Sequence, residues 1–93
     1  MQFVVVTTDH TRRGVFAGDL VSHEGDVVVL ENAQQCVYWS RETRGVLGLA
    51  SKGPQEGSRI GPPVPSIKID GVTAVIEATT EARKLWESQP WAL

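Results

Sequence analysis

The sequence predicts a mainly β protein: a small twisted antiparallel sheet or partial barrel of about six strands with one C-terminal helix. Two observations support this fold class, which is α+β only through that helix. Short segments rich in β-branched and aromatic residues recur along the chain and alternate with turn residues. One amphipathic helical pattern is present, and it lies near the C-terminus.

The chain of 93 residues is expected to form a single domain, 1–93, because single domains usually contain about 50 to 250 residues. A chain of this length buries roughly 60–65% of its unfolded surface, so its core is modest. Association with further copies would enlarge that core, and we expect a homo-oligomer.

The first three strands are predicted from apolar, β-branched segments. Residues 2–8 form the first strand, and residues 15–22 follow after a polar turn. Gly18 within the second strand indicates a bulge or a close backbone approach. Residues 23–26 form a short turn. Residues 27–31 are almost wholly apolar, which predicts a third strand buried on both faces.

Residues 32–35 interrupt the strand pattern. Residues 36–40 have strong β propensity and are predicted to be a fourth strand. Residues 46–50 are apolar and are predicted to be a fifth strand that leads into a long loop.

That loop, residues 51–65, is the most irregular segment of the chain. It holds four of the five prolines and three of the nine glycines. Proline lacks an N–H group and glycine is costly to order, so neither a strand nor a helix is expected here. Loops of this length are uncommon in compact domains and are usually functional or disordered.

The remaining elements close the chain. Residues 67–69 alternate, residues 70–71 are a tight-turn pair, and residues 72–78 are the last predicted strand. The C-terminal helix begins at Thr79 or Thr80, either of which can supply an N-cap hydroxyl. The apolar stripe of this helix consists of Ala82, Leu85 and Trp86. Pro90 is predicted to end the helix.

A site for a small anion is predicted from Tyr38, Trp39, Arg41, Ser58 and Arg59. Tyr38 and Trp39 are neighbours on a strand and point to opposite faces, so one packs in the core and the other can stack on a ligand. The sequence leaves open which one does so. A guanidinium on a proline-stiffened loop with glycine N–H groups nearby suits a phosphate or carboxylate. A solvated Arg59 is the simpler alternative.

Two charged turns could rim such a site. Arg41 and Arg44 flank one turn, and Arg12 and Arg13 form another. Charged turns are usually only solvated, and these arginines would contribute only if the turns cluster at one end of the sheet.

No catalytic constellation is evident. Cys36 has no nearby base in the sequence, and a cysteine in an apolar strand is usually buried and inert. His10 and His23 lie in predicted turns without an ordered carboxylate partner. The acidic residues are scattered. We therefore expect a protein that is not an enzyme and that uses no metal or cofactor.

Net charge, apolar runs and cysteine content indicate which partners and which cellular location are expected. A formal net charge of −2 argues against a general nucleic-acid binder. No apolar run approaches the roughly 20 residues of a membrane span. A single cysteine and a start without a basic leader suit a cytoplasmic location. Trp86 and Trp91 are expected to pack within the chain or in a homo-oligomer interface.

The chain resembles a family of small bacteriophage and prophage proteins of unknown function. The resemblance rests on residues 14–18 with Leu20, on residues 28–33 leading to Tyr38 and Trp39, on residues 47–50, and on the C-terminal run. That run comprises Val75, Ile76, Glu77, Thr79, Thr80, Glu81, Ala82 and Trp91. The resemblance implies a phage context and, for a phage protein, the cytoplasm of the host cell. The family carries no assigned catalytic residues.

Two functions are expected from these observations. The first is a non-enzymatic accessory protein that sequesters a small anionic ligand, such as a nucleotide signal of bacterial immunity. The second is a protein-interaction module that acts on a host or phage protein through an edge strand or through the proline-rich residues 62–65.

Overall fold

A computed structural model describes residues 2–9 and 14–88. The predicted fold class is confirmed: six antiparallel strands form a sheet that does not close, and a helix follows at the C-terminal side. Within the described residues the elements are β1 (Phe3–Thr8), β2 (Val15–Glu24), β3 (Val27–Tyr38), the 3₁₀ turn η1 (Arg41–Thr43), α1 (Gly45–Ser51), β4 (Arg59–Ile60), β5 (Val64–Ile69), β6 (Val72–Glu77) and α2 (Thr80–Ser88).

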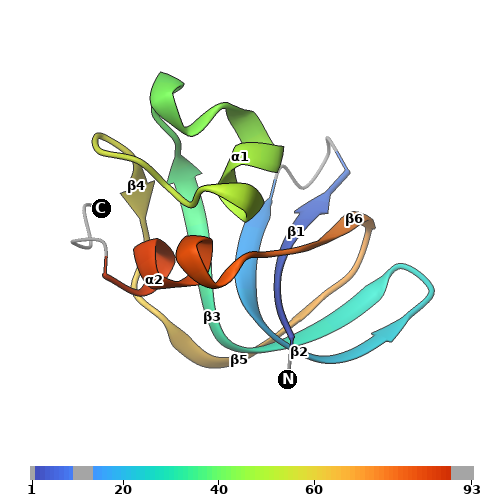
Figure 1. Ribbon diagram of the computed structural model, residues 1–93. Helices are drawn as coiled ribbons and strands as arrows, with labels where there is room; N and C mark the ends of the chain where they lie inside the picture. Colours follow the sequence, from blue (N-terminus) through green and yellow to red (C-terminus); the bar gives the residue numbers. More distant parts are fainter. Residues whose placement is uncertain (1, 10–13, 89–93) are drawn as a thin grey trace.

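The sheet is strongly curled. Its strand order is β4-β3-β2-β1-β6, and β5 pairs with the N-terminal part of β3 beside β4. The predicted tight turn at Asp70 and Gly71 therefore joins strands that lie at opposite edges of the sheet and are not paired (Figure 1). A hydrogen bond from the Val72 N–H to the Asp26 carbonyl oxygen, 3.0 Å long, holds this connection against the β2–β3 turn.

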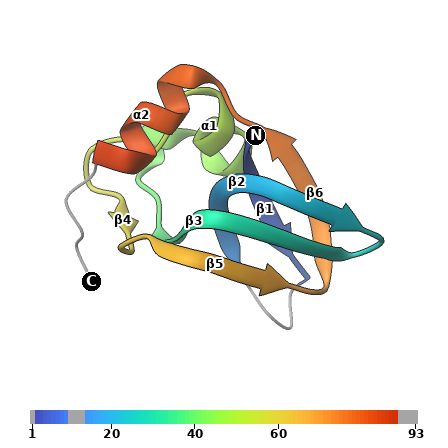
Figure 2. The ribbon, with the colours of Figure 1, turned by 90° about the horizontal axis from the view of Figure 1, so that it is seen from below.

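Two cores lie on the two faces of the sheet. The helix-side core lies beneath α1 and α2, which cover the same side of β1 (Figure 2). Its buried members are Phe3, Val5, Ala17, Cys36, Leu49, Ala50, Ile60 and Trp86. The inner core lies within the curl, and its buried members are Val4, Val6, Val28, Leu30, Ala33 and Ile69.

The strand buried on both faces is β1. Residues 3–6 are all buried and alternate between the two cores. The prediction that residues 27–31 are buried on both faces is wrong, because Val28 and Leu30 are buried whereas Val27 and Val29 are half-buried. The reason is position: β1 lies between β2 and β6 with covered faces on both sides.

The predicted third and fourth strands are one strand, β3, of 12 residues. The interruption at residues 32–35 is a bulge, and not a break. Asn32 has a φ of 51°. Glu31 pairs with Asp19 and Gln34 pairs with Ala17, so β3 has two residues between these pairs where β2 has one. One additional residue kinks a strand without ending its pairing.

The irregularity predicted at Gly18 is confirmed. The pairing of β2 with β3 shifts register between Ala17 and Asp19. A Cβ atom at Gly18 would lie 2.8 Å from the Glu31 carbonyl oxygen, so the curl brings two backbones closer than a side chain allows.

The predicted fifth strand, residues 46–50, is wrong: the segment belongs to helix α1. Leu49 and Ala50 are buried in the helix-side core, whereas Leu47 is 70% exposed. A short apolar run cannot be assigned to a helix or a strand by periodicity alone. Here the helix is favoured because it buries one side against α2 and β1.

The loop predicted at residues 51–65 is also more ordered than expected. Ser51 ends α1, Arg59 and Ile60 form β4, and β5 begins at Val64. Pro65 fits within β5 because that strand pairs only with β3, so a missing N–H on its outer edge removes no ladder bond.

The predicted C-terminal helix is confirmed as α2. Thr79 is its N-cap, because its hydroxyl oxygen accepts the Ala82 N–H at 3.0 Å. Ala82 and Trp86 are fully buried and Leu85 is half-buried. The Trp86 indole N–H donates to the Leu49 carbonyl oxygen at 3.0 Å. The stop predicted at Pro90 lies outside the described residues.

Candidate functional site

Tyr38 and Arg59, which are distant in sequence, lie opposite one another where β3 and β4 pair. They line a hollow of about 480 Å³ together with Val37 and Gly57. We call this hollow, defined by these four residues, the β3–β4 hollow. It combines an aromatic face, an aliphatic wall and a cation.

A bulge at Val37 directs Tyr38 outward. Cys36 pairs with Ile60 and Tyr38 pairs with Arg59. Arg59 and Ile60 are adjacent in β4, so Val37 is an additional residue of β3 with no partner in β4. Val37 and Tyr38 are both more than half exposed, at 56% and 55%. The open question about the aromatic pair is thereby resolved: Tyr38 is exposed, and Trp39 is half-buried against the helix-side core.

The Arg59 side chain is exposed at the edge of this hollow. Among the described residues it makes no hydrogen bond or ion pair. An arginine without an internal partner keeps its five donors for solvent or a ligand, and it can bind a carboxylate or phosphate through two of them at once.

Ser58, which directly precedes β4, connects the start of this strand to Ser40 and Thr43. It is only 6% exposed, and its hydroxyl oxygen accepts the backbone N–H of Ser40 at 3.0 Å. It also lies 3.3 Å from the Thr43 hydroxyl. Gln55 completes the cluster, because its N–H donates to the Thr43 hydroxyl oxygen at 3.0 Å. Ser58 is therefore a buried residue that supports the strand next to the hollow, and it does not line the hollow itself.

Arg41 begins η1 and is exposed. It is not among the residues that line the β3–β4 hollow. Arg44 follows η1 with a φ of 71°. Of the predicted set, the structure thus brings together Tyr38 and Arg59, whereas Trp39, Arg41 and Ser58 do not line the hollow.

Cys36 is buried in the helix-side core. Burial raises the pKa of its thiol from 9.0 to about 11, against a smaller opposing effect of a backbone hydrogen bond at Tyr38. A thiol of this kind is protonated at neutral pH and is a poor nucleophile. The prediction that Cys36 is buried is confirmed, and its low reactivity stays a prediction.

The other titratable candidates contribute little. His23 lies in β2, and not in a turn as predicted, because β2 continues to Glu24. His10, Arg12, Arg13 and Trp91 lie outside the described residues. Within residues 2–9 and 14–88, no cluster of three or more histidine, cysteine or acidic side chains is placed to hold a metal ion. No helix there has the length and apolar character needed to cross a bilayer.

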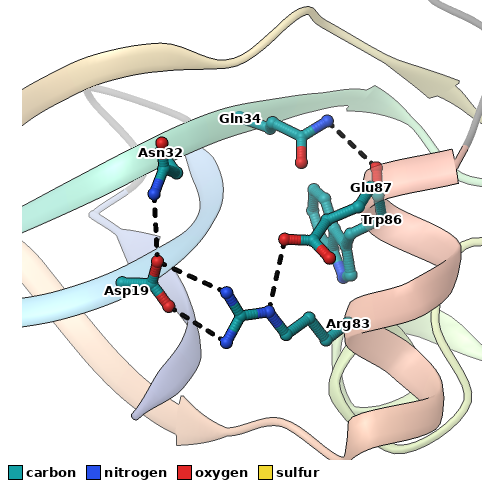
Figure 3. A network of polar contacts seen from close by, with 6 residues as sticks. All are labelled: Asp19, Asn32, Gln34, Arg83, Trp86 and Glu87. Atoms are coloured by element: carbon teal, nitrogen blue, oxygen red, sulfur yellow. Dashed lines mark hydrogen bonds and ion pairs between the residues drawn. The ribbon is translucent and has the colours of Figure 1, made fainter. Parts of the chain in front are cut away.

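A second polar cluster, which sequence reasoning missed, joins α2 to the sheet (Figure 3). The Arg83 guanidinium lies 3.2 Å from the buried carboxylate of Asp19 and 3.2 Å from Glu87. The Asn32 amide donates to Asp19 at 3.2 Å, and Arg83 lies 5.1 Å from the centre of the Phe3 ring. These charges are paired with one another, so the cluster attaches α2 to β2 and β3.

Comparisons with known proteins identify one family. A family model described as a domain of unknown function (DUF6948) matches residues 1–86. No curated protein and no solved structure matches the chain significantly.

Proposed function

The chain belongs to this DUF6948 family, and we propose that it is a non-enzymatic binding protein that captures a small anionic ligand in the β3–β4 hollow. One observation carries the proposal: an exposed tyrosine and an arginine with no partner among the described residues face the same hollow, from two strands that pair there. An aromatic face and a guanidinium are the groups with which proteins hold the base and the phosphate of a nucleotide.

The proposal extends to the biological context. The ligand is a nucleotide signal of bacterial immunity, the protein is a phage-type accessory factor in the cytoplasm of the host, and it acts by sequestration as a homo-oligomer. The role is proposed to be without turnover. Within residues 2–9 and 14–88, Cys36 is buried in the helix-side core and His23 is exposed on β2.

Titration calorimetry tests the proposal directly. Cyclic dinucleotides, cyclic trinucleotides and cyclic ADP-ribose isomers are titrated into the protein, and material released by heat denaturation is analysed by ultraviolet absorbance and mass spectrometry. We expect binding of at least one nucleotide. No binding of any of them at high micromolar concentration would exclude the nucleotide version.

Arg59→Ala identifies the site. We expect it to weaken the affinity for the bound nucleotide at least about tenfold, because a charge-assisted hydrogen bond contributes about 1.5–3 kcal/mol. Its unfolding midpoint should be unchanged, because the Arg59 side chain makes no hydrogen bond or ion pair with the described residues. Lys84→Ala, which removes an exposed charge on α2, is the matched control. Equal affinities for the two variants would contradict the assignment.

A protein-interaction module remains the second candidate. The observation in its favour is that Val37 and Tyr38 are adjacent and both more than half exposed, which is typical of an aromatic contact at the centre of an interface. A stoichiometric protein partner that is captured by the native chain and lost with Tyr38→Ala, without any copurifying nucleotide, would favour this function over the first.

A further inference from the structure

A second hollow lies beside the first. It has a volume of about 290 Å³, and its walls are largely apolar side chains from β2, β3 and the segment that connects β4 to β5. We call it the apolar crevice, lined by Phe16, Ala33, Gln34, Gln35, Gly61, Pro62, Val64 and Ile67. No charged side chain lines it.

The crevice is a continuation of the space within the curl. Ala33 belongs to the inner core, and Phe16 and Ile67 pack against that core. Its far wall is held by Gln34, whose side-chain amide donates to the carbonyl oxygens of Gly61 at 3.3 Å and Trp86 at 3.0 Å. Gln34 is only 3% exposed, so this wall is fixed by a buried contact to α2.

The crevice and the β3–β4 hollow share one face of β3. Gln35 lines the crevice and Val37 lines the hollow, and both are exposed on either side of the buried Cys36. The partner segment repeats this order, because the Gly61 N–H donates to the Gln35 carbonyl oxygen at 2.8 Å and Arg59 pairs with Tyr38. At about 3.3 Å per residue, Gln35 and Val37 are roughly 7 Å apart.

The two sites differ in chemistry. The hollow offers the guanidinium of Arg59 and the phenol of Tyr38, whereas the crevice offers aliphatic and aromatic walls with an amide at its edge. A site of this composition favours an uncharged planar or apolar group, because burying a charge among apolar side chains without a partner is costly.

We infer that the crevice is a second subsite for the same ligand, and that it receives the uncharged ring while the anionic group lies at Arg59. The ligand class is therefore an anion joined to a flat ring system over roughly 7 Å, the distance between Gln35 and Val37 along β3. This inference rests on the proposed function and changes one part of it: the ring that was assigned to the aromatic face of Tyr38 enters the crevice, and Tyr38 lies beside the anionic group at Arg59.

Amide chemical shifts can report the two sites separately. The probes are adenosine 5′-monophosphate, ribose 5-phosphate and adenosine, each titrated into the ¹⁵N-labelled chain. Ribose 5-phosphate is expected to shift the amides of Tyr38 and Arg59 alone. Adenosine is expected to shift those of Gln35 and Gly61 alone, and the monophosphate should shift both pairs.

The outcomes distinguish the inference from the proposed function. If neither phosphate shifts the Arg59 amide, the anion site is wrong and the proposed function fails with it. If both phosphates shift Arg59 but the monophosphate leaves Gln35 and Gly61 unchanged, the anion site stands and the crevice inference is overturned. Shifts at Gly61 that depend on protein concentration without any probe would mean that a second copy covers the crevice, which also overturns it.

Filling the crevice gives an independent test. Val64 lines the crevice and is 44% exposed, so Val64→Phe adds a ring there while keeping a residue with high β propensity. We expect Val64→Phe to weaken the affinity for the monophosphate at least about tenfold and the affinity for ribose 5-phosphate less than about twofold. The reason is that the new side chain occupies only the space that the adenine ring would fill. Val21→Phe is the matched control, since Val21 is 46% exposed and lines neither site. Equal effects on both phosphates would contradict the inference.

Discussion

Tyr38 reaches solvent because of one extra residue in β3. Strict alternation places Tyr38 and Trp39 on opposite faces, and that expectation is met, since Trp39 packs inward and Tyr38 outward. Alternation also predicts that Val37 and Tyr38 differ, yet both are exposed. The bulge opposite β4 accounts for this, because it places two residues of β3 against one of its partner.

Cys36 predicts how the free energy of unfolding depends on pH. Its pKa is raised from 9.0 to about 11 by burial, so the thiol is protonated in both the folded and the unfolded chain below pH 9. Between pH 9 and about 11 the unfolded chain loses the proton first. The free energy of unfolding should therefore fall as pH rises through this window, by up to about 1.4 kcal/mol per pH unit from this group.

Urea unfolding at pH 8, 9 and 10 measures this effect, with Cys36→Ala as the comparison. The native protein should lose more stability than the variant across this window, because alanine does not titrate. The folded protein should also react with a disulfide reagent only slowly at pH 8. Parallel pH dependences for the two proteins would contradict the assignment of a raised thiol pKa to Cys36.

At the scale of the element, α1 is the clearest difference between expectation and structure. Residues 46–50 contain β-branched and helix-forming residues in a run too short for periodicity to decide. Two backbone features favour the helix. Arg44 and Gly45 both have positive φ, at 71° and 78°, which turns the chain sharply out of η1. Gly48 then allows the helix to lie directly against that turn.

Gly48 tests this account. A Cβ atom at Gly48 would lie 1.6 Å from the carbonyl oxygen of Thr43 and 2.7 Å from its carbonyl carbon. Gly→Ala within a helix normally stabilises by about 0.5–1 kcal/mol. At Gly48 we expect the opposite sign and a loss of at least about 2 kcal/mol, because backbone atoms must move apart.

Chemical denaturation followed by circular dichroism measures that loss. Leu47→Ala on the same helix is the control, since Leu47 is 70% exposed and its substitution should change stability by no more than about 0.5 kcal/mol. A Gly48→Ala protein as stable as the native chain would mean that α1 does not pack against η1 as described.

On the scale of the whole molecule, Trp86 joins three parts of the chain. Its indole N–H donates to Leu49 of α1 at 3.0 Å, and its carbonyl oxygen accepts the Gln34 amide of β3 at 3.0 Å. Its side chain is fully buried in the helix-side core. The expectation that Trp86 packs within the chain or in an interface is thus resolved in favour of packing within the chain.

Trp86→Phe should therefore destabilise the whole molecule. We expect a loss of about 2–4 kcal/mol in the free energy of unfolding, because the substitution leaves a cavity and a buried carbonyl group without its donor. This is a large fraction of the roughly 5–15 kcal/mol that stabilises a small domain. Urea unfolding followed by far-ultraviolet circular dichroism measures it, with Lys84→Ala as the exposed control on α2. A loss below about 1 kcal/mol would contradict the central position of Trp86.

The local pattern of residues was sufficient for the mainly β fold class, for the close backbone approach at Gly18, for the Thr79 cap and apolar stripe of α2, and for the burial of Cys36. These features depend on neighbours in sequence. The pairing of Tyr38 with Arg59, the helix α1 and the Asp19–Arg83 ion pair depend on which segments meet after the sheet curls. Contacts across such distances arise from packing between elements, and no short-range pattern in the sequence encodes them.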